Sequence, residues 1–291
     1  MIYIEREKGP KELDLSNKKS IGSIELAEAI IYFKTKTKSF DFSAYKNVNV
    51  VEELKKMFHG KCAYCESEIR VISYEEIEHF RPKGAIKLKT NEKLEYPGYY
   101  WLAMQWDNLV VSCPKCNKIK GNYFPIENEN NRVRNHLQSS QEEPLLINPC
   151  EENPANHLFF TEEGYIKYKT NKGEHSIKHY GLFRRELTKT REKLAKDILM
   201  KEKQILNGFK NIMFFKQCID TFPGAKERIE EQTLEILEIY DSILIYINKK
   251  ELPYRQMIIQ LTEKFRKDYG AELEVLKIRY EKSIQKKLVH K

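Results

Sequence analysis

Apolar residues recur at helical spacing near the start of the chain and again across its last third. The spacing predicts helices over residues 23–33 and 51–58. From about Leu182 onward the pattern is again helical, with breaks near Pro223 and Pro253. Both ends of the chain are therefore predicted to be helical.

The middle of the chain has no helical period. Residues 61–126 are dense in cysteine, aromatic and turn-forming residues, and the polar residues 127–143 are expected to form a loop. Residues 145–147 and the alternating run 164–168 have the composition of β-strands. The fold class predicted is α+β, within a largely α-helical protein. Its four segments are an N-terminal helical segment (1–57), a cysteine-rich domain (58–135), a loop and β-hairpin region (136–180) and a C-terminal helical region (181–291).

Composition places the chain among globular proteins. Of the 291 residues 41% are hydrophobic and 32% charged, and the mean hydropathy is −0.65. No apolar run approaches the roughly 20 residues that cross a bilayer. The first eight residues lack the basic and then apolar order of a secretory signal. We therefore expect a soluble cytoplasmic protein.

Charge is distributed unevenly along the chain. The formal net charge is +8, and the residues from Gly181 onward carry 24 lysines and arginines against 17 aspartates and glutamates. Most of the basic excess therefore lies in the C-terminal segment. Such an excess suits a polyanionic partner, but it is also common in proteins without one, so charge alone assigns no function.

Four of the six cysteines form two CxxC pairs, Cys62/Cys65 and Cys113/Cys116. This spacing lets two thiolates from one tight turn bind the same ion, and four thiolates at about 2.3 Å complete a zinc tetrahedron. Two unrelated pairs or a thiol redox motif are the alternatives, and the repeated spacing favours zinc. A closed four-thiolate site leaves no position for substrate, so this zinc is predicted to be structural.

Further polar residues lie between and beside the cysteine pairs. They stand in three short motifs: Glu78-His79-Phe80-Arg81-Pro82-Lys83, Asn108-Leu109 and Asn117-Lys118-Ile119-Lys120-Gly121. Their order resembles the HNH nuclease motif in its zinc-containing variant. The resemblance implies a ββα-metal core, a β-hairpin followed by a helix with one catalytic metal ion between them. Glu78 and His79 would lie on the first strand and Asn117 on the helix.

The same resemblance implies a role for each of the four catalytic-site residues. His79 would be the general base that activates water, Glu78 and Asn117 would bind the catalytic metal, and Asn108 would pin the hairpin loop. The chemistry suits a phosphodiester. A neutral imidazole takes up a proton near pH 7, and a divalent ion neutralises the charge that develops on phosphate oxygens.

The motif departs from common family members at two positions. Glu78 stands where aspartate is common, and Asn117 stands where many members have histidine. Both side chains offer hard oxygen ligands, so Mg²⁺ or Mn²⁺ is the expected catalytic ion.

Four basic residues flank the motif and are candidate contacts for nucleic-acid phosphates: Arg81, Lys83, Lys118 and Lys120. Solvated surface charge is the alternative explanation for them.

Longer runs of sequence extend the resemblance over about residues 58–190. They resemble the HNH subunit of Septu-type antiphage systems (PtuB-like), a family also found beside some retrons: residues 61–66, 78–83, 99–102, 120–125, 144–149 and 181–187. The resemblance implies a partner, an ABC/SMC-like ATPase subunit (PtuA-like), that restrains the nuclease until infection. It makes 58–135 a zinc-stapled nuclease domain. It also favours 181–291 as a docking region for the ATPase, with a plain helical scaffold as the alternative.

Three functions remain open at this point. The first is a metal-dependent endonuclease acting on DNA as an antiphage effector. The second is the same site cutting RNA such as tRNA, because the motif recognises a phosphodiester and not the 2′-hydroxyl. The third is a zinc-containing nucleic-acid-binding module without catalysis, which would have no need of Glu78, His79 and Asn117 together.

Overall fold

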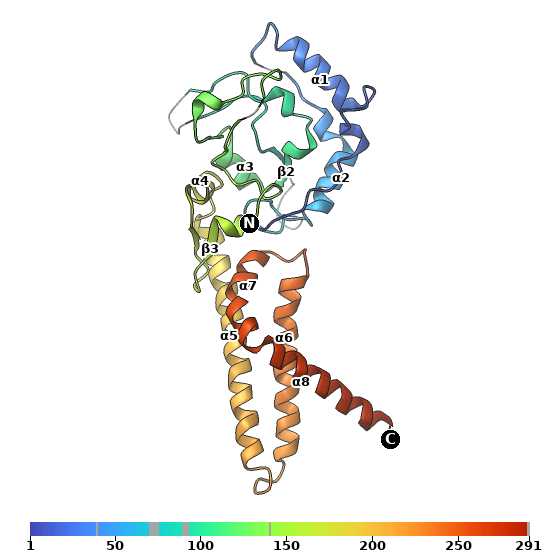
Figure 1. Cartoon of the computed structure of the whole chain (residues 1–291), viewed down its shortest axis with the longest axis vertical. Coiled ribbons are helices and arrows are strands. Elements are labelled where there is room, and N and C mark those ends of the chain that lie inside the picture. The colour runs from blue at the N-terminus through green and yellow to red at the C-terminus, as the bar shows by residue number, and fades with distance from the viewer. Residues whose placement is uncertain (39, 70–75, 89–92, 140, 290–291) are drawn as a thin grey trace. The chain divides into compact units, whose positions relative to one another are not determined.

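The computed structural model describes residues 1–38, 40–69, 76–88, 93–139 and 141–289. Contacts divide the chain into two compact units (Figure 1). The first unit is made of Met1–Phe159 and Ile166–Leu187, and the second of Phe160–Tyr165 and Thr188–Lys291. Among the helices of the described residues, none is both long and apolar enough to cross a bilayer.

The first unit begins with two helices, α1 (Ile21–Tyr32) and α2 (Val48–Met57). The hydroxyl of Ser20 caps α1 by accepting a hydrogen bond from the amide of Ser23 at 3.1 Å, and the side chain of Asn47 caps α2. Both predicted N-terminal helices are confirmed.

A two-stranded antiparallel sheet and a helix form the centre of the first unit. Strand β1 (Glu76–His79) pairs with β2 (Leu109–Ser112), and α3 (Pro114–Lys120) follows β2 directly. The register sets Glu78 opposite Val110 and His79 opposite Leu109. Proline at the first position of α3 suits a helix start, because its missing N–H would have no helical partner there.

A second pair of strands and one more helix follow in the chain. Strand β3 (Leu158–Phe160) pairs with β4 (Ile166–Tyr168), and α4 (Asn171–His179) comes next. Strand β4 confirms the strand expected over 164–168. Helix α4 was not predicted, and it lies in the segment expected to be loop and hairpin.

Residues 145–147 do not form the strand that their composition predicted. The amide of Ile147 donates to the hydroxyl of Ser176 at 2.9 Å, and its carbonyl accepts from the hydroxyl of Tyr180 at 2.9 Å. Side chains of α4 and of the residue that ends it therefore provide the hydrogen-bond partners of the Ile147 backbone. The apolar run 145–147 can be buried without joining a sheet.

Short 3₁₀ turns connect these elements: Lys11–Leu13, Ala44–Lys46, Tyr100–Leu102, Trp106–Asn108, Glu129–Asn131 and Pro154–Asn156.

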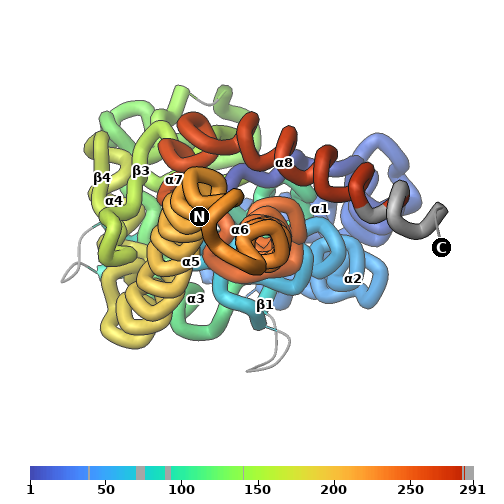
Figure 2. Tube along the Cα trace, turned by 90° about the horizontal axis from the view of Figure 1, so that it is seen from below, coloured from blue at the N-terminus to red at the C-terminus, as the bar shows by residue number. Residues whose placement is uncertain are grey.

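The second unit is helical. Its helices are α5 (Arg185–Gln217), α6 (Ala225–Asn248), α7 (Arg255–Leu261) and α8 (Glu263–Val289). The first residues of α5 belong to the first unit. Helices α5 and α6 lie side by side in the views of Figure 1 and Figure 2, and Figure 1 shows that they run antiparallel. Lys201 on α5 bonds Ser242 on α6 at 2.9 Å, and Asn211 bonds Gln232 at 2.9 Å. The helix breaks predicted near Pro223 and Pro253 are confirmed.

Candidate active site

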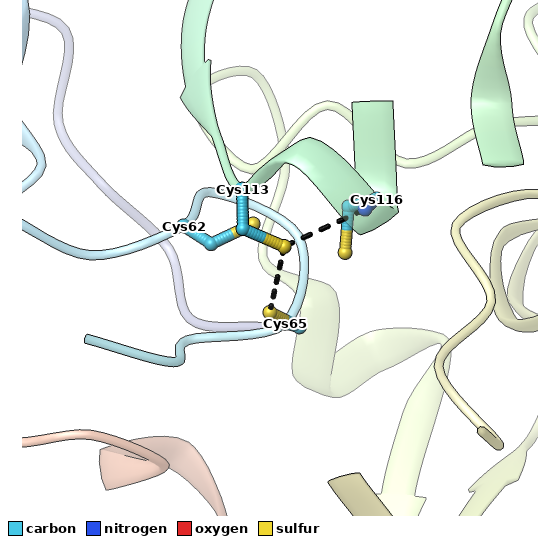
Figure 3. A group of neighbouring side chains, drawn as sticks. All are labelled: Cys62, Cys65, Cys113 and Cys116. Atoms are coloured by element: carbon cyan, nitrogen blue, oxygen red, sulfur yellow. Dashed lines mark hydrogen bonds between the residues drawn. The ribbon is translucent and has the colours of Figure 1, made fainter. Parts of the chain in front are cut away.

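The two CxxC turns bring four sulfur atoms together in the first unit (Figure 3). The Sγ atoms of Cys62, Cys65, Cys113 and Cys116 all lie within 4.8 Å of one another, and those of Cys65 and Cys113 are 3.9 Å apart. Four thiolates around one zinc ion stand roughly 3.8 Å from each other, given bonds of about 2.3 Å. The cluster could therefore hold zinc with little movement.

An arginine from a distant part of the chain lies against this cluster. Arg184 Nη1 donates to Cys116 Sγ at 3.3 Å, and its Nη2 donates to Cys113 Sγ at 3.7 Å. Four thiolates and a zinc ion carry a net charge of about −2, and a guanidinium at this distance offsets part of that charge. No local sequence pattern marks Arg184 for this role, because its partners lie far away along the chain.

His79 ends β1, and each of its two ring nitrogens has a hydrogen-bond partner. Its Nε2 donates to the carbonyl oxygen of Ala103 at 2.9 Å, so Nδ1 is the nitrogen with the lone pair. Lys83 Nζ lies 3.4 Å from Nδ1. Burial, reinforced by the positive charge of Lys83, holds the pKa of His79 well below its ordinary value. The imidazole is therefore a neutral acceptor at pH 7.

Glu78 and Lys120 form a buried ion pair. Glu78 Oε1 accepts from Lys120 Nζ at 2.6 Å, and Lys120 also donates to the carbonyl oxygen of His79 at 2.9 Å. Lys120 is 0% exposed and Glu78 is 7% exposed. Burial raises the pKa of Glu78, while the ammonium of Lys120 opposes that rise. The pair ties α3 to β1 and leaves Glu78 Oε2 for another ligand.

Glu78, His79 and Asn117 line one pocket of about 690 Å³. Asn117 is half-buried on α3, and within the part of the chain that the structure describes its carboxamide makes no hydrogen bond. Its carboxamide oxygen and Glu78 Oε2 are the hard donors that Mg²⁺ and Mn²⁺ accept. The donor set therefore fits a divalent ion.

Asn108 lies outside the lining of this pocket, and among the described residues its side chain bonds to backbone atoms. Its Oδ1 accepts from the amide of Arg81 at 2.7 Å, and its Nδ2 donates to the carbonyl oxygens of Arg81 and Leu102 at 3.0 and 3.1 Å. Asn108 thus connects the segment after β1 to the turn before β2. This geometry suits the loop-fixing role expected of it.

The four basic residues predicted as phosphate contacts have different surroundings. Lys83 lines the pocket and Lys118 is exposed on α3. Arg81 Nε instead bonds Glu142 Oε2 at 3.1 Å, and Lys120 is enclosed with Glu78. Two of the four therefore reach the pocket or the surface, and two are engaged inside the unit.

One side of the pocket is apolar, and no sequence pattern predicted it. Phe33, Phe40, Phe42 and Tyr45 line this side. The ring of Tyr45 meets the ring of His79 edge to face, with centroids 4.6 Å apart and an interplanar angle of 83°. These residues follow α1 in the chain, and only folding brings them to β1.

Comparison with known proteins identifies relatives along most of the chain. The Septu protein PtuB of Bacillus mycoides (strain KBAB4) is 49% identical over 268 residues, which cover 91% of this chain and 90% of that protein. A Septu protein PtuB of Bacillus thuringiensis is 34% identical over 106 residues, 36% of this chain and 30% of the relative.

A third relative bears a different name. The Septu protein PtuA of Bacillus mycoides (strain KBAB4) is 29% identical over 200 residues, which are 67% of this chain and 25% of that protein. No family model and no solved structure matches the chain. Because the first PtuB relative shares 49% identity along almost the whole of both chains, this protein belongs to the PtuB family of Septu defence proteins.

Proposed function

We propose that this protein is a metal-dependent HNH endonuclease that hydrolyses phosphodiester bonds in DNA. The observation that carries the proposal is the single pocket in which Glu78, His79 and Asn117 meet, with Nδ1 of His79 as its basic nitrogen. A neutral base beside two oxygen ligands for a metal ion is the arrangement of a metal-dependent hydrolase. A module that only binds nucleic acid does not require these groups.

The chain's own groups divide the work of hydrolysis. His79 takes the proton of the attacking water at Nδ1, and the carbonyl of Ala103 stabilises the imidazolium that forms. Lys83 is placed to bind a non-bridging phosphate oxygen. Glu78 and Asn117 would hold a divalent ion, which when bound supplies charge neutralisation on the phosphate.

The remaining predicted residues support this site without touching substrate. Asn108 holds the backbone that follows His79, and Lys120 offsets the charge of Glu78. We assign Arg81 to its ion pair with Glu142 and keep Lys118 as a surface contact for nucleic acid. The four cysteines hold a structural zinc ion apart from cleavage.

The test is cleavage of plasmid DNA in Mg²⁺ or Mn²⁺ by the full-length protein, with and without its ATPase. Replacing His79 by alanine removes the base, so we expect cutting to fall by about 10²- to 10⁴-fold with the zinc content unchanged. His157→Ala is the control, because it removes a histidine that does not line the pocket. Equal cutting by His79→Ala and the unaltered protein would refute the proposal.

Total tRNA is the second substrate in the same experiment. None of the residues Glu78, His79 and Asn117 distinguishes DNA from RNA, because each acts on the phosphodiester and not on the 2′-hydroxyl. Cutting of tRNA but not of plasmid would reassign the polymer while leaving the site in place.

We further propose that the protein acts in an antiphage complex with an ABC/SMC-like, PtuA-like ATPase. Support comes from the Bacillus mycoides PtuA, in which a quarter of the chain resembles this protein. The second unit offers a docking surface where α5 ends and α6 begins: Met213, Phe214 and Phe222 are 62%, 60% and 44% exposed.

A substitution at that surface tests the partnership. Phe214→Ser removes an exposed aromatic anchor, so we expect the full-length protein to retain less ATPase in co-purification. Ile31→Ser is the matched control, since Ile31 is 66% exposed on α1 in the first unit. Unchanged retention with Phe214→Ser would exclude this surface as the docking site.

A further inference from the structure

The aromatic side of the pocket has no task in the hydrolysis proposed above. Of the four aromatic residues there, Phe33, Phe40 and Tyr45 are half-buried, whereas Phe42 is 4% exposed. Three aromatic rings therefore present part of their surface beside the groups assigned to cleavage, and the Phe33 ring is stacked on Tyr100.

Neighbouring aromatic rings pack together and hold Phe40 in place. Phe33 stacks on Tyr100 with centroids 4.4 Å apart, and Phe42 lies 4.7 Å from Phe40 at an interplanar angle of 54°. The rings of Phe33 and Phe40 are 6.1 Å apart. We call Phe40 and Tyr45 the aromatic wall. The rings of Phe33, Phe42 and Tyr100 are its support.

Two lysines lie near the Tyr45 end of the aromatic wall, and one of them, Lys46, is 3.6 Å from Asp41 Oδ1. Lys83 Nζ lies 4.7 Å from the centroid of the Tyr45 ring, and Lys46 Nζ lies 5.6 Å from it. The same Lys83 Nζ lies 3.4 Å from Nδ1 of His79. Cations, the basic nitrogen and an aromatic ring thus meet within one pocket, and the ring of Phe40 borders the same space.

A nucleotide presents the complementary chemistry, an anionic phosphate joined to a flat base. With the phosphate at His79 and Lys83, its base can reach the aromatic wall. The faces of a base are covered by neighbouring bases in a continuous duplex. They become available when the nucleotide is unpaired or turned out of the helix.

We propose that the aromatic wall stacks the base of an unpaired nucleotide, so that the protein selects single-stranded over continuous double-stranded nucleic acid. This inference rests on the proposed nuclease function, since it takes the scissile phosphate to lie at His79. Every base has a stacking face, so the wall itself accepts DNA and RNA alike.

Fluorescence of 2-aminopurine tests the inference without cleavage, because stacking on an aromatic ring quenches it. The probe is an oligonucleotide with one 2-aminopurine, supplied as single-stranded DNA, single-stranded RNA and blunt duplex DNA. The protein is the full chain carrying His79→Ala. We expect quenching and about tenfold tighter binding with a single-stranded probe relative to the duplex.

Variants of the aromatic wall identify the rings responsible. Phe40→Ala and Tyr45→Leu should each weaken single-strand binding by about tenfold and reduce quenching, whereas Tyr45→Phe keeps the ring and should retain both. Tyr3→Ala, which removes a side chain 47% exposed elsewhere in the first unit, is the control. Zinc content and the unfolding midpoint show that each variant folds. If Phe40→Ala does not fold, the comparison of Tyr45→Leu with Tyr45→Phe decides.

The outcomes separate this inference from the nuclease assignment. Equal affinity for duplex and single strand, or full quenching in both Phe40→Ala and Tyr45→Leu, overturns the stacking role. If His79→Ala has also lost cutting, the nuclease assignment survives that result. Quenching with only one of the two single-stranded polymers supports stacking and identifies the polymer.

Discussion

Neighbouring polar residues of the short helix α3 have different surroundings, and Lys120 is the clearest case. Asn117 and Lys120 are three positions apart on α3 and share a side of it, whereas Lys118 points elsewhere. Asn117 lines the pocket, Lys120 enters the unit to meet Glu78, and Lys118 is exposed. From the sequence and its resemblance to HNH proteins, Asn117 is singled out as a metal ligand, but Lys118 and Lys120 have the same expected role of phosphate contact.

Replacing Lys120 by methionine should destabilise the first unit by about 3–5 kcal/mol, because it leaves the carboxylate of Glu78 buried without a partner. Tryptophan fluorescence during urea unfolding measures the change, since Trp101 and Trp106 both lie in the first unit. A second replacement, Glu78→Gln, should restore much of the loss by removing the buried charge.

Lys118→Met on the same helix is the control for that experiment. Because Lys118 is exposed, its loss should change the free energy of unfolding by no more than about 0.5 kcal/mol. If Lys120→Met and Lys118→Met are equally stable, the buried ion pair does not stabilise the protein as described.

At the scale of elements, α4 shows why a helix can escape a sequence pattern. Helix α4 is nine residues long and mostly polar, so its buried positions are few. Its buried face carries Ser176 and His179. Tertiary contacts of these side chains stabilise the helix. Ser176 bonds the backbone of Ile147, and the ring centroid of His179 lies 4.5 Å from that of Tyr123.

The buried His179 on α4 should make stability depend on pH. Burial lowers the pKa of His179 from 6.5 to about 4, with His175 and Lys178 adding to the shift. Between these values the unfolded chain binds a proton that the folded protein does not. The free energy of unfolding should therefore fall as the pH is lowered through this window.

A variant isolates that contribution. His179→Phe keeps an aromatic ring against Tyr123 and cannot take up a proton. Urea unfolding at about pH 7 and about pH 5 should show a smaller loss of stability in His179→Phe than in the unaltered protein. Equal losses would mean that His179 is not the group responsible.

At the scale of the whole molecule, the candidate zinc site and both tryptophans belong to the first unit, whereas the second unit is built mainly of long helices. Residue pairs such as Lys201 with Ser242 and Lys277 with Asp241 connect those helices to each other. The second unit therefore has internal contacts that do not depend on zinc.

Removing zinc with a strong chelator should unfold the first unit and leave much of the helical signal. We expect tryptophan emission to shift to the red, while far-UV circular dichroism keeps the contribution of α5 to α8. Cys113→Ser should behave like the chelated protein. Cys218→Ser is the control, because Cys218 belongs to the second unit and is not a member of the sulfur cluster. Unchanged emission after complete removal of zinc would contradict a structural zinc site.

The sequence by itself determined the features of this protein that depend on residues close together along the chain. Each CxxC turn needs only short-range geometry, and the repetition of the spacing predicted that the two turns share one ion. Helical periodicity predicted α1, α2 and the breaks between the C-terminal helices. The strand and helix placement of His79 and Asn117 followed from the resemblance to HNH proteins, since two four-residue strands are too short for a pattern of their own.

Tertiary structure alone decided which side chains meet. The pairing of Lys120 with Glu78, the guanidinium of Arg184 at the sulfur cluster and the aromatic wall beside His79 all join residues far apart in the sequence. Each depends on which face of an element is buried and on which loop covers it. A linear pattern records the type of a side chain, whereas its partner and its exposure to water are fixed only when distant segments pack together.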